Sequence, residues 1–414
     1  MTSEGQSDMD RFLSLAKTLA DGTDEAGRKK VLDTLRDVAY SIESPEDTIQ
    51  RVMFYNLQLA SVRIGIDLKL FDILTENGNH MTVEQLAAST GASSLLLGRL
   101  LRYLASIAMI KETAKDVFVA TNITRTLSIP GFQGGVHHYF DTFGPAIQAL
   151  PDFLKETKYA NVTDNTNTPL QMAWNTTQPA FIWVQTKPEN FAYFNHWMAA
   201  QRHGMPTWLD VYPVEGTAQH LGPEEPLFVD VGGGLGQQCI ALRERFPHLS
   251  GKVILQDIPQ TLTHAIRHDR VEIMEQDFFE PQPIKGTDAA RHYSTSSSPI
   301  PQRSQADRSS GAKFYYMRNI LHDYPDKQCL IILKNTIAAM GKGSVLLVDD
   351  MVLPNSGIHW QAAQLDMAMM TAMAAVERTK EQWYTLLESA GLKINKIWTY
   401  TTSLQDSIVE AVLP

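Results

Sequence analysis

The spacing of apolar residues predicts that the chain begins with helices. Between residues 8 and 73, apolar side chains recur every three or four positions, as in Phe12, Leu15 and Leu19. This spacing places them on one face of a helix. Ser44, followed by proline and two acidic residues, is typical of a helix start, because serine caps the first turn and acids favour the positive end of the helix dipole.

The next stretch has the pattern of a winged helix. Three helical segments lie between residues 70 and 107, the second of them capped by Thr82, and two short strand-like runs follow at 110–113 and 117–120. Helix-turn-helix units of this kind commonly bind DNA. The formal net charge of −10, with few basic residues on the third helix, argues against nucleic acid as a partner.

After a helical stretch at 134–204, short apolar runs alternate with helical segments. The runs lie at 227–231, 252–256, 271–275, 313–317 and 344–349. Strands that are apolar throughout are buried on both faces, which predicts an α/β fold with a parallel, doubly wound sheet. Residues 287–311 interrupt the alternation. They are rich in Ser, Pro, Arg and Gln, and we expect them to form a disordered surface insertion.

Composition limits the class of protein and its compartment. Of the 414 residues, 43% are hydrophobic and 20% are charged, as in an ordinary soluble protein. The two cysteines, Cys239 and Cys329, provide neither a disulfide framework nor a structural zinc site. The N-terminus lacks the features of a signal peptide, and the longest Met/Ala-rich stretch is interrupted by Asp366. We therefore expect a cytoplasmic protein that does not bind membranes.

The clearest motif is the glycine-rich segment D-V-G-G-G-L-G, which begins at Asp230 and includes Gly232 and Gly234. It joins a buried strand to a helix, where glycines allow a sharp turn and close approach of the backbone to a ligand. A lone Gly-x-Gly-x-x-Gly is weak evidence by itself. An acidic residue within the strand is better known from proteins that bind S-adenosylmethionine (SAM) than from those that bind NAD.

Acidic residues also follow the next two strands. Asp257 ends the second strand, where a carboxylate can accept hydrogen bonds from both ribose hydroxyls. Asp277 follows the third strand and could accept the adenine amino proton, with Phe278 packing on the ring. Either acid alone is as easily explained as a loop cap. A glycine turn and two acids at three successive strand ends favour a binding site for SAM.

The fourth strand is followed by His322, on the side of an open sheet where ligands bind. A lone histidine is more often structural, but this location favours a role in acid–base chemistry. A neutral phenol, with a pKa of about 10, is a weak nucleophile. Removal of its proton by a positioned base typically contributes about 10²–10⁴-fold in rate.

At this point the motifs L-H-D-Y-P-D, V-D-D-M-V-L-P and V-E-R-T resemble the fungal and plant small-molecule O-methyltransferases of the caffeate/flavonoid type, over nearly the whole chain. The resemblance implies that His322 is the general base with Asp323 beside it, and that Asp350 and Glu377 are the acids flanking the base. Asp350 stands where the family usually has glutamate, one methylene longer. The resemblance also places Gly232, Asp257, Asp277, Phe278 and Arg318 around SAM.

The same resemblance implies a domain organisation and a partner. Residues 1–125 would form a helical dimerisation and winged-helix domain, residues 126–215 a helical linker and substrate-pocket region, and residues 216–414 a Rossmann-like SAM-binding domain. The first helices, before the winged helix, would interlock two subunits of a homodimer. Since the sequence has no metal-ligand cluster, we expect no metal requirement.

The residues that form the substrate pocket are harder to identify from the sequence. Aromatic and methionine side chains are abundant in residues 134–204 and 367–373, and most of them must be core packing. We expect Met198, Met370 and Met373 to face the substrate, together with Asp323.

Two other functions stay open. Some fungal relatives bind SAM but act as dehydratases or pericyclases without methyl transfer, and in such an enzyme His138 or Arg202 could polarise a carbonyl. A non-enzymatic winged-helix regulator is the second alternative.

Overall fold

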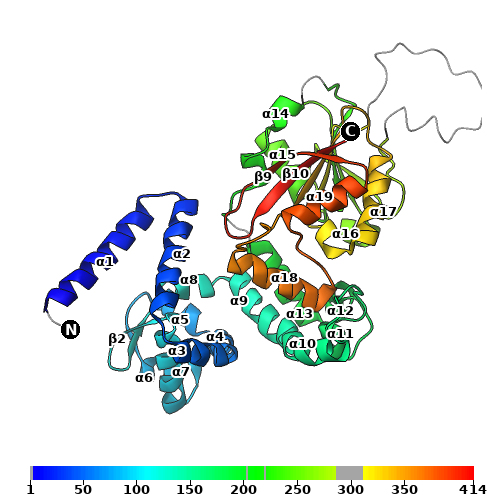
Figure 1. Cartoon of the computed structure of the whole chain (residues 1–414). Helices are drawn as coiled ribbons and strands as arrows, with labels where there is room; N and C mark the ends of the chain where they lie inside the picture. The colour runs from blue at the N-terminus through cyan, green and yellow to red at the C-terminus, as the bar shows by residue number, and fades with distance from the viewer. Residues whose placement is uncertain (1–2, 202–203, 219–220, 286–310) are drawn as a thin grey trace, which may run out of the picture. The chain divides into compact units, whose positions relative to one another are not determined.

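The computed structural model describes residues 3–201, 204–218, 221–285 and 311–414 (Figure 1). The chain divides into two compact units, Met1–Ala160 with Thr166–Gly204, and Asn161–Asn165 with Met205–Pro414. The sequence prediction for residues 287–311 falls, apart from Gly311, outside the described residues, and so does Arg202.

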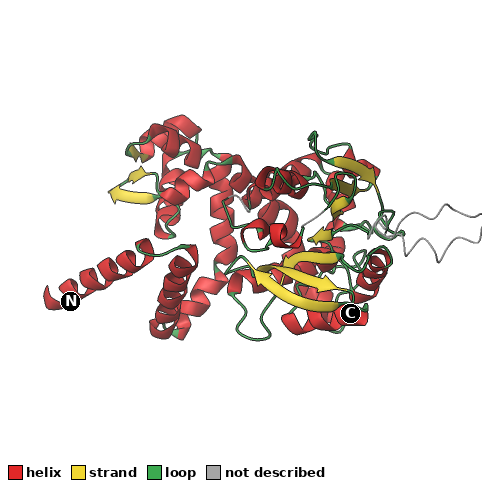
Figure 2. Cartoon of the chain, turned by 90° about the horizontal axis from the view of Figure 1, so that it is seen from above, coloured by secondary structure: helices red, strands yellow, loops and turns green. Residues whose placement is uncertain are grey.

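The N-terminal unit is mainly helical, with one small sheet (Figure 2). Its elements are α1 (Ser3–Asp21), α2 (Glu25–Ile42), α3 (Pro45–Met53), α4 (Tyr55–Asp67), α5 (Leu70–Asn77), β1 (Met81–Thr82), α6 (Val83–Thr90), α7 (Ser94–Ser106), β2 (Lys111–Ala114), β3 (Val117–Val119), α8 (Asn122–Leu127), α9 (Pro130–His137), the π-helix η1 (His138–Phe143), α10 (Gly144–Glu156), α11 (Pro169–Trp174), α12 (Ala180–Gln185) and α13 (Pro188–Ala200).

The predicted helix caps are confirmed. The Ser44 hydroxyl accepts a hydrogen bond from the Asp47 backbone N–H at 3.1 Å, at the start of α3. Thr82 and Gln85 form a reciprocal capping box at the start of α6. Such caps satisfy N–H groups that have no partner within the helix.

The winged helix is also confirmed, with one addition. The predicted strands β2 and β3 pair as a hairpin, and β1, which was not predicted, pairs with the other edge of β3. The core of this unit includes the fully buried side chains of Leu70, Phe71, Leu101 and Phe118. A two-residue strand leaves no periodic pattern, so only its pairing with Phe118 reveals it.

Three glycines explain how α9 packs against α13. A Cβ atom at Gly131 would lie 2.2 Å from the Cβ of Ala200, and one at Gly135 would lie 2.6 Å from the Trp197 ring. A Cβ at Gly134 would lie 2.7 Å from the Cβ of His196. Any larger residue would push the two helices apart, so this stretch is glycine-rich because of close packing.

The C-terminal unit contains the large sheet. Its elements are the 3₁₀-helix η2 (Trp208–Asp210), α14 (Val214–Thr217), β4 (Pro226–Val231), α15 (Gln237–Arg245), β5 (Lys252–Asp257), α16 (Pro259–Leu262), β6 (Glu272–Glu275), β7 (Phe314–Arg318), the 3₁₀-helix η4 (Leu321–Asp323), α17 (Asp326–Ile337), β8 (Val345–Met351), α18 (Trp360–Met373), α19 (Lys380–Ser389), β9 (Lys393–Thr399) and β10 (Asp406–Val412).

The sheet has the order β6-β5-β4-β7-β8-β10-β9. The five predicted strands β4 to β8 are present within one or two residues of their expected positions and pair in parallel. Two strands that were not predicted extend this sheet at one edge, where β10 pairs antiparallel with β8 and β9 pairs antiparallel with β10. The strand order reverses between β4 and β7, and ligands bind at such a switch point.

Alternate side chains of the central strands enter two separate cores. Tyr315 and Met317 of β7 belong to one hydrophobic cluster with Trp383, and Tyr316 belongs to the other with Trp208. Both faces of the sheet are therefore buried, as the apolar runs indicated. The predicted cofactor-binding residues lie at the ends of these strands or in the segments that follow them.

Candidate active site

The glycine-rich turn between β4 and α15 has a backbone shape that strongly favours glycine. Gly232, Gly234 and Gly236 have φ values of 71°, 61° and 87°, in the left-handed region. A Cβ atom at Gly232 would lie 2.7 Å from the Ile320 side chain. No heavy atom lies within 4 Å of the Cβ position at Gly234 among the described residues, so the backbone there is open to a ligand.

The predicted residues that follow β5 and β6 lie around this turn. One carboxylate oxygen of Asp257 accepts a hydrogen bond from the Gly234 N–H at 2.9 Å, and the other accepts from the Ile258 N–H at 2.8 Å. The Phe278 ring lies 3.3 Å from the Cβ position at Gly232. Asp277 is exposed, and its carboxylate accepts from the Phe279 N–H at 2.9 Å.

These residues fit the adenosine part of SAM. The turn leaves space above Gly234, the half-buried Asp257 is held beside it, and the half-buried Phe278 lies next to Gly232. Carboxylates accept hydrogen bonds from hydroxyl and amino groups, and an aromatic ring packs against a base. These residues lie at the ends of three successive strands, β4, β5 and β6, or just after them, as the sequence indicated.

Asp230 and Arg318 lie below the turn. Asp230 is 1% exposed, and burial raises its pKa to about 7. Arg318 Nε lies 3.6 Å from Oδ2 of Asp349, and the same oxygen accepts a hydrogen bond from the Tyr316 hydroxyl. The other carboxylate oxygen of Asp349 accepts a hydrogen bond from the Tyr400 hydroxyl at 2.6 Å. Burial lowers the pKa of Arg318, but Asp349 and other negative neighbours raise it above its usual value. Asp349 was not singled out from the sequence, although it stands next to Asp350.

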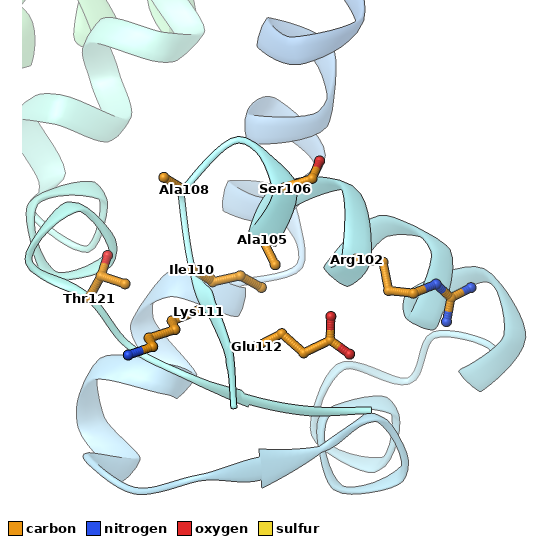
Figure 3. Close-up of a pocket in the computed structure, with 8 residues that line it drawn as sticks. All are labelled: Arg102, Ala105, Ser106, Ala108, Ile110, Lys111, Glu112 and Thr121. Carbon is orange, nitrogen blue, oxygen red and sulfur yellow. The ribbon is translucent and has the colours of Figure 1, made fainter. Parts of the chain in front are cut away.

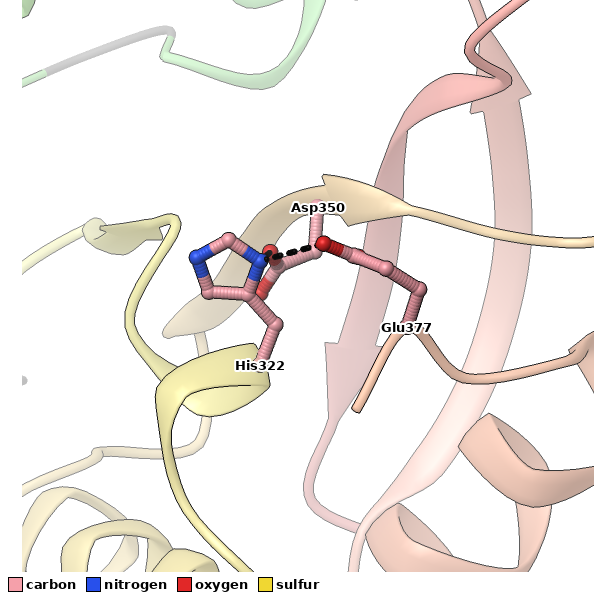
Figure 4. Close-up of side chains that lie close together, drawn as sticks. All are labelled: His322, Asp350 and Glu377. Carbon is pink, nitrogen blue, oxygen red and sulfur yellow. Dashed lines mark hydrogen bonds and ion pairs between the residues drawn. The ribbon is translucent and has the colours of Figure 1, made fainter. Parts of the chain in front are cut away.

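His322 lies in η4, directly after β7, with two carboxylates on one side of its ring (Figure 4). Its Nδ1 atom lies 2.9 Å from Glu377 Oε1 and 3.7 Å from Asp350 Oδ1. Only the contact with Glu377 is a hydrogen bond. The Nε2 atom points away from both acids and lies 3.4 Å from an oxygen of Asp323.

The charges around His322 favour its protonated form. Burial lowers the pKa of His322, but its three carboxylate neighbours, led by Asp323, raise it to about 10. Burial also raises the pKa of Asp350 to about 8, although His322 opposes this effect. Burial therefore favours the neutral form of Asp350, and Glu377 is the acid that is hydrogen-bonded to Nδ1.

The shorter side chain of Asp350 has a visible consequence. Both of its oxygens are buried and have no hydrogen-bond partner within the described residues, and the same is true of Glu377 Oε2. One ligand atom from each of His322, Asp350 and Glu377 lies within 4.8 Å of the others. Because the Nδ1 proton is already used in the bond to Glu377, we interpret this group as a hydrogen-bonded base.

Asp366, on α18, supports the site and was not predicted to do so. Its carboxylate accepts a hydrogen bond from the Glu377 backbone N–H at 2.9 Å. The signal was present in the sequence, since a single acid interrupts a Met/Ala-rich helix. Asp366 and Met370 also line a hollow of about 320 Å³ within the C-terminal unit.

The residues predicted to face the substrate are divided between the two units. In the C-terminal unit, Met370 and Met373 are half-buried on α18. In the N-terminal unit, Met198 on α13 is 40% exposed.

His138, also in the N-terminal unit, is buried in η1. Its ring lies among those of Tyr139, Phe143 and Phe194, with centroids 5.1–5.6 Å away. Burial lowers the pKa of His138 to about 4, and its Nδ1 has no hydrogen-bond partner within the described residues.

A separate hollow of about 450 Å³ lies between the end of α7 and β2 (Figure 3). Arg102, Ile110 and Glu112 are among its lining residues, and none of the predicted site residues lines it. Within the described residues, no helix combines the length and apolar character needed to cross a bilayer.

Comparison with known proteins identifies the class. An O-methyltransferase domain matches residues 305–393, and an O-methyltransferase dimerisation domain matches residues 31–128. The 16-O-methyltransferase bsc6 of Alternaria brassicicola is 40% identical over 98% of this chain and 97% of its own length. The demethylsterigmatocystin 6-O-methyltransferase of Aspergillus parasiticus is 37% identical over 97% of each chain. The chain therefore belongs to the O-methyltransferase family, and its cofactor is SAM.

Solved structures agree with this assignment and add a complication. The structure of LepI with SAM is 36% identical and covers 99% of this chain and 100% of that chain, with a TM-score of 0.87. A structure described as a pericyclic reaction enzyme, also 36% identical with the same coverage, has a TM-score of 0.86. The chain therefore shares its fold with an enzyme that is described by a different reaction class.

Proposed function

We propose that this protein transfers the methyl group of SAM to a hydroxyl of a small aromatic or polyketide-type molecule, with His322 as the general base. The observation that carries this proposal is the orientation of the imidazole. Glu377 holds Nδ1 at 2.9 Å, which makes Nδ1 the protonated nitrogen of the neutral ring. The Nε2 lone pair then faces away from Glu377 and Asp350 and can accept a proton.

The reaction needs one proton transfer and one displacement. The sulfonium of bound SAM supplies an electrophilic methyl group. His322 Nε2 takes the hydroxyl proton of the acceptor as the oxygen forms its bond to the methyl carbon. The electrons of the broken carbon–sulfur bond stay on sulfur. The proton remains on the imidazole, where Glu377 and Asp323 stabilise the positive charge.

The high pKa of His322 bears on how the cycle begins. An imidazolium cannot accept a proton, so the base must be neutral when the acceptor binds. A positive sulfonium nearby disfavours a second positive charge, so His322 would release its proton more readily in the SAM-loaded enzyme. A pKa near 10 also makes His322 a strong acceptor for a phenolic proton once it is neutral.

For the acceptor, we infer contacts with Met370, Met373 and Asp323 of the C-terminal unit. The roles expected from the sequence for His138, Met198 and Arg202 stay predictions. The aromatic surroundings and neutral state of His138 suit an apolar ring that carries a hydroxyl or carbonyl group. Relatives named for methylation of small molecules, such as demethylsterigmatocystin, support this class of acceptor.

The second candidate is a SAM-bound dehydratase or pericyclase without methyl transfer. It is favoured by the 36% identity to a pericyclic reaction enzyme over 99% of this chain. In that case the sulfonium would act as a fixed positive charge, and the neutral His138 could polarise a carbonyl. The bonded pair of His322 and Glu377 would then have no role as a base, and for this reason we place methyl transfer first.

One assay separates the two candidates. The protein is incubated with labelled SAM and extracts of its source, and product mass is measured alongside release of S-adenosylhomocysteine. Transfer predicts one S-adenosylhomocysteine per methylated product. In His322→Ala, turnover should fall by about 10²-fold or more, with SAM affinity within a few-fold. Product that forms without added methyl mass and without S-adenosylhomocysteine would reject methyl transfer.

We also propose that the protein is a cytoplasmic homodimer. Its N-terminal helices expose large apolar side chains that one chain leaves uncovered, among them Leu13, Leu15 and Leu19 of α1, each more than 50% exposed. Burial of such a surface against a second copy is strongly favourable. The two cysteines are buried and unpaired, as is usual in a reducing compartment.

A further inference from the structure

Arg378 directly follows Glu377 and is one of the largest buried side chains of the C-terminal unit. It is 2% exposed, although a guanidinium is always charged. Burying a charge costs free energy unless hydrogen bonds satisfy it, so the Arg378 guanidinium can be buried only because acceptors surround it. Those acceptors all belong to the turn that carries His322 and to the start of the following helix.

The guanidinium spans this turn from one end to the other. One terminal nitrogen donates to the Leu321 carbonyl at 2.7 Å, and the other donates to the Tyr324 carbonyl at 2.8 Å. Nε and the second terminal nitrogen also donate to one carboxylate oxygen of Asp326, at 3.1 and 2.8 Å. Leu321 and Tyr324 immediately bracket His322 and Asp323, so the bonds hold both sides of the base.

Apart from the guanidinium, the turn is held by the thiol of Cys329, a weak donor, which bonds to the Leu321 carbonyl at 3.1 Å and to the Tyr324 carbonyl at 3.2 Å. It is a single 3₁₀ turn, whose hydrogen-bond geometry is poorer than that of an α-helix, and carbonyls near a helix end need outside partners. The His322 carbonyl accepts a hydrogen bond from the Val376 N–H at 3.0 Å. The two residues that flank Glu377, Val376 and Arg378, therefore both bind the turn that carries His322, the first through its main chain and the second through its guanidinium.

We propose that Arg378 is a positioning residue, whose guanidinium sets the His322 ring at hydrogen-bond distance from Glu377. Its role in catalysis rests on the proposed function, but its effect on the ring does not. The bond between His322 and Glu377 is 2.9 Å long, and a displacement of about 1 Å would break it. Lysine keeps the charge but, with a single ammonium group, cannot reach acceptors at both ends of the turn in the planar geometry of arginine.

The first test reads the histidine directly and needs no acceptor molecule. The dimeric full-length protein is labelled with [¹³Cε1]histidine, and the His322 resonance is assigned as the one missing in His322→Gln. In the unsubstituted protein, this resonance should stay at its imidazolium position from pH 6.5 to pH 9, below the pKa of about 10. In Arg378→Lys the resonance should move towards the neutral position within that range, because the pKa falls by at least about one unit when the ring leaves its acid.

Asp326→Asn is the matched variant. The Asp326 side chain is 67% exposed, so its loss weakens the hold on Arg378 without opening the core. It should shift the titration in the same direction by a smaller amount. If Arg378→Lys does not fold, as judged by SAM binding, the result with Asp326→Asn decides. A His322 titration that is unchanged in every folded variant, with only the melting temperature lowered, would show a purely structural role and overturn the proposal.

Kinetics then connect the position of the ring to turnover. Once an acceptor is known, Arg378→Lys should lower kcat by about 10-fold or more while KM for SAM changes by less than about 3-fold. Equal losses in kcat and SAM affinity would contradict positioning. If the unsubstituted protein proves not to transfer methyl groups, the proposed function fails, whereas the histidine titration still tests the role of Arg378.

Discussion

The unequal contacts of the two acids with His322 lead to a sharp prediction about Glu377 and Asp350. Glu377→Gln keeps the shape and a neutral acceptor for the Nδ1 proton, but it removes the negative charge. Asp350→Asn is a matched change at a second buried acid in the same group. We expect Glu377→Gln to lower kcat strongly and Asp350→Asn to change it little near neutral pH.

The magnitudes follow from distance and charge. A hydrogen bond to a charged group contributes about 1.5–3 kcal/mol, and two unit charges about 4 Å apart attract by about 4 kcal/mol at an effective dielectric constant of about 20. Losing the Glu377 charge, 2.9 Å from Nδ1, should therefore cost about 10²-fold in kcat. Asp350 makes no hydrogen bond within the described residues, and burial raises its pKa to about 8, which favours its neutral form near neutral pH. Asp350→Asn then replaces one neutral group with another, and kcat should stay within about 3-fold.

The assay is the initial rate of S-adenosylhomocysteine release with the acceptor found by SAM labelling. SAM affinity and melting temperature, measured for each variant, show whether a loss reflects the chemical step. The effect of Asp350→Asn should grow above pH 8, where the natural carboxyl ionises. A loss in Asp350→Asn as large as that in Glu377→Gln near neutral pH would refute this reasoning, because it would mean that Asp350 is charged and supports the base equally.

Three further predictions test the cofactor site, the buried charges and the assembly. Asp257→Ala should weaken SAM binding by about 1.5–3 kcal/mol in calorimetry, and unchanged affinity would place Asp257 away from the ribose. The folded-state pKa of His322 is raised from 6.5 to about 10, so its contribution to stability is complete below pH 6.5 and is lost as the pH rises through 10. The raised pKa of Asp350 acts in the same direction, so the denaturation midpoint should fall as the pH is raised, and His322→Gln should flatten that fall. Light scattering at micromolar concentration should give a dimeric mass, and a monomer would contradict the homodimer proposed for the N-terminal helices.

Local hydrophobic patterns in the sequence predicted much of the fold. The strands β4, β5, β7 and β8 were predicted closely, because strands buried on both faces are continuous apolar runs. Strands β9 and β10 were missed, since β9 is largely exposed and β10 contains buried polar residues such as Asp406, and β10 becomes a strand by pairing with a distant partner, β8. An antiparallel edge of this kind depends on contacts between residues more than 50 positions apart, as between Ser407 and Asp350.

The candidate active site also combines residues that the sequence predicted with contacts that only the structure shows. The glycine turn, Asp257, Asp277 and His322 could be proposed from sequence, because parallel strands all present their carboxyl ends at one edge of the sheet. The likeness of V-E-R-T to a family motif pointed to Glu377, but it did not say which acid bonds to His322. That depends on side-chain length and on where β8 and the segment after α18 meet, and the structure places Glu377 at 2.9 Å and Asp350 at 3.7 Å.

The sequence by itself determined the class of fold and led to the glycine turn as the proposed SAM site and to His322 as the proposed base, because each is encoded in a short stretch of chain with its own pattern. Only the tertiary structure decided the protonation and support of that base. His322 is separated by 55 residues from Glu377, and the Arg378 side chain reaches back across 57 residues to the Leu321 carbonyl. Burial and charge at that meeting point arise from packing of the whole unit, and burial is what makes the pKa values of these groups depart from their ordinary range.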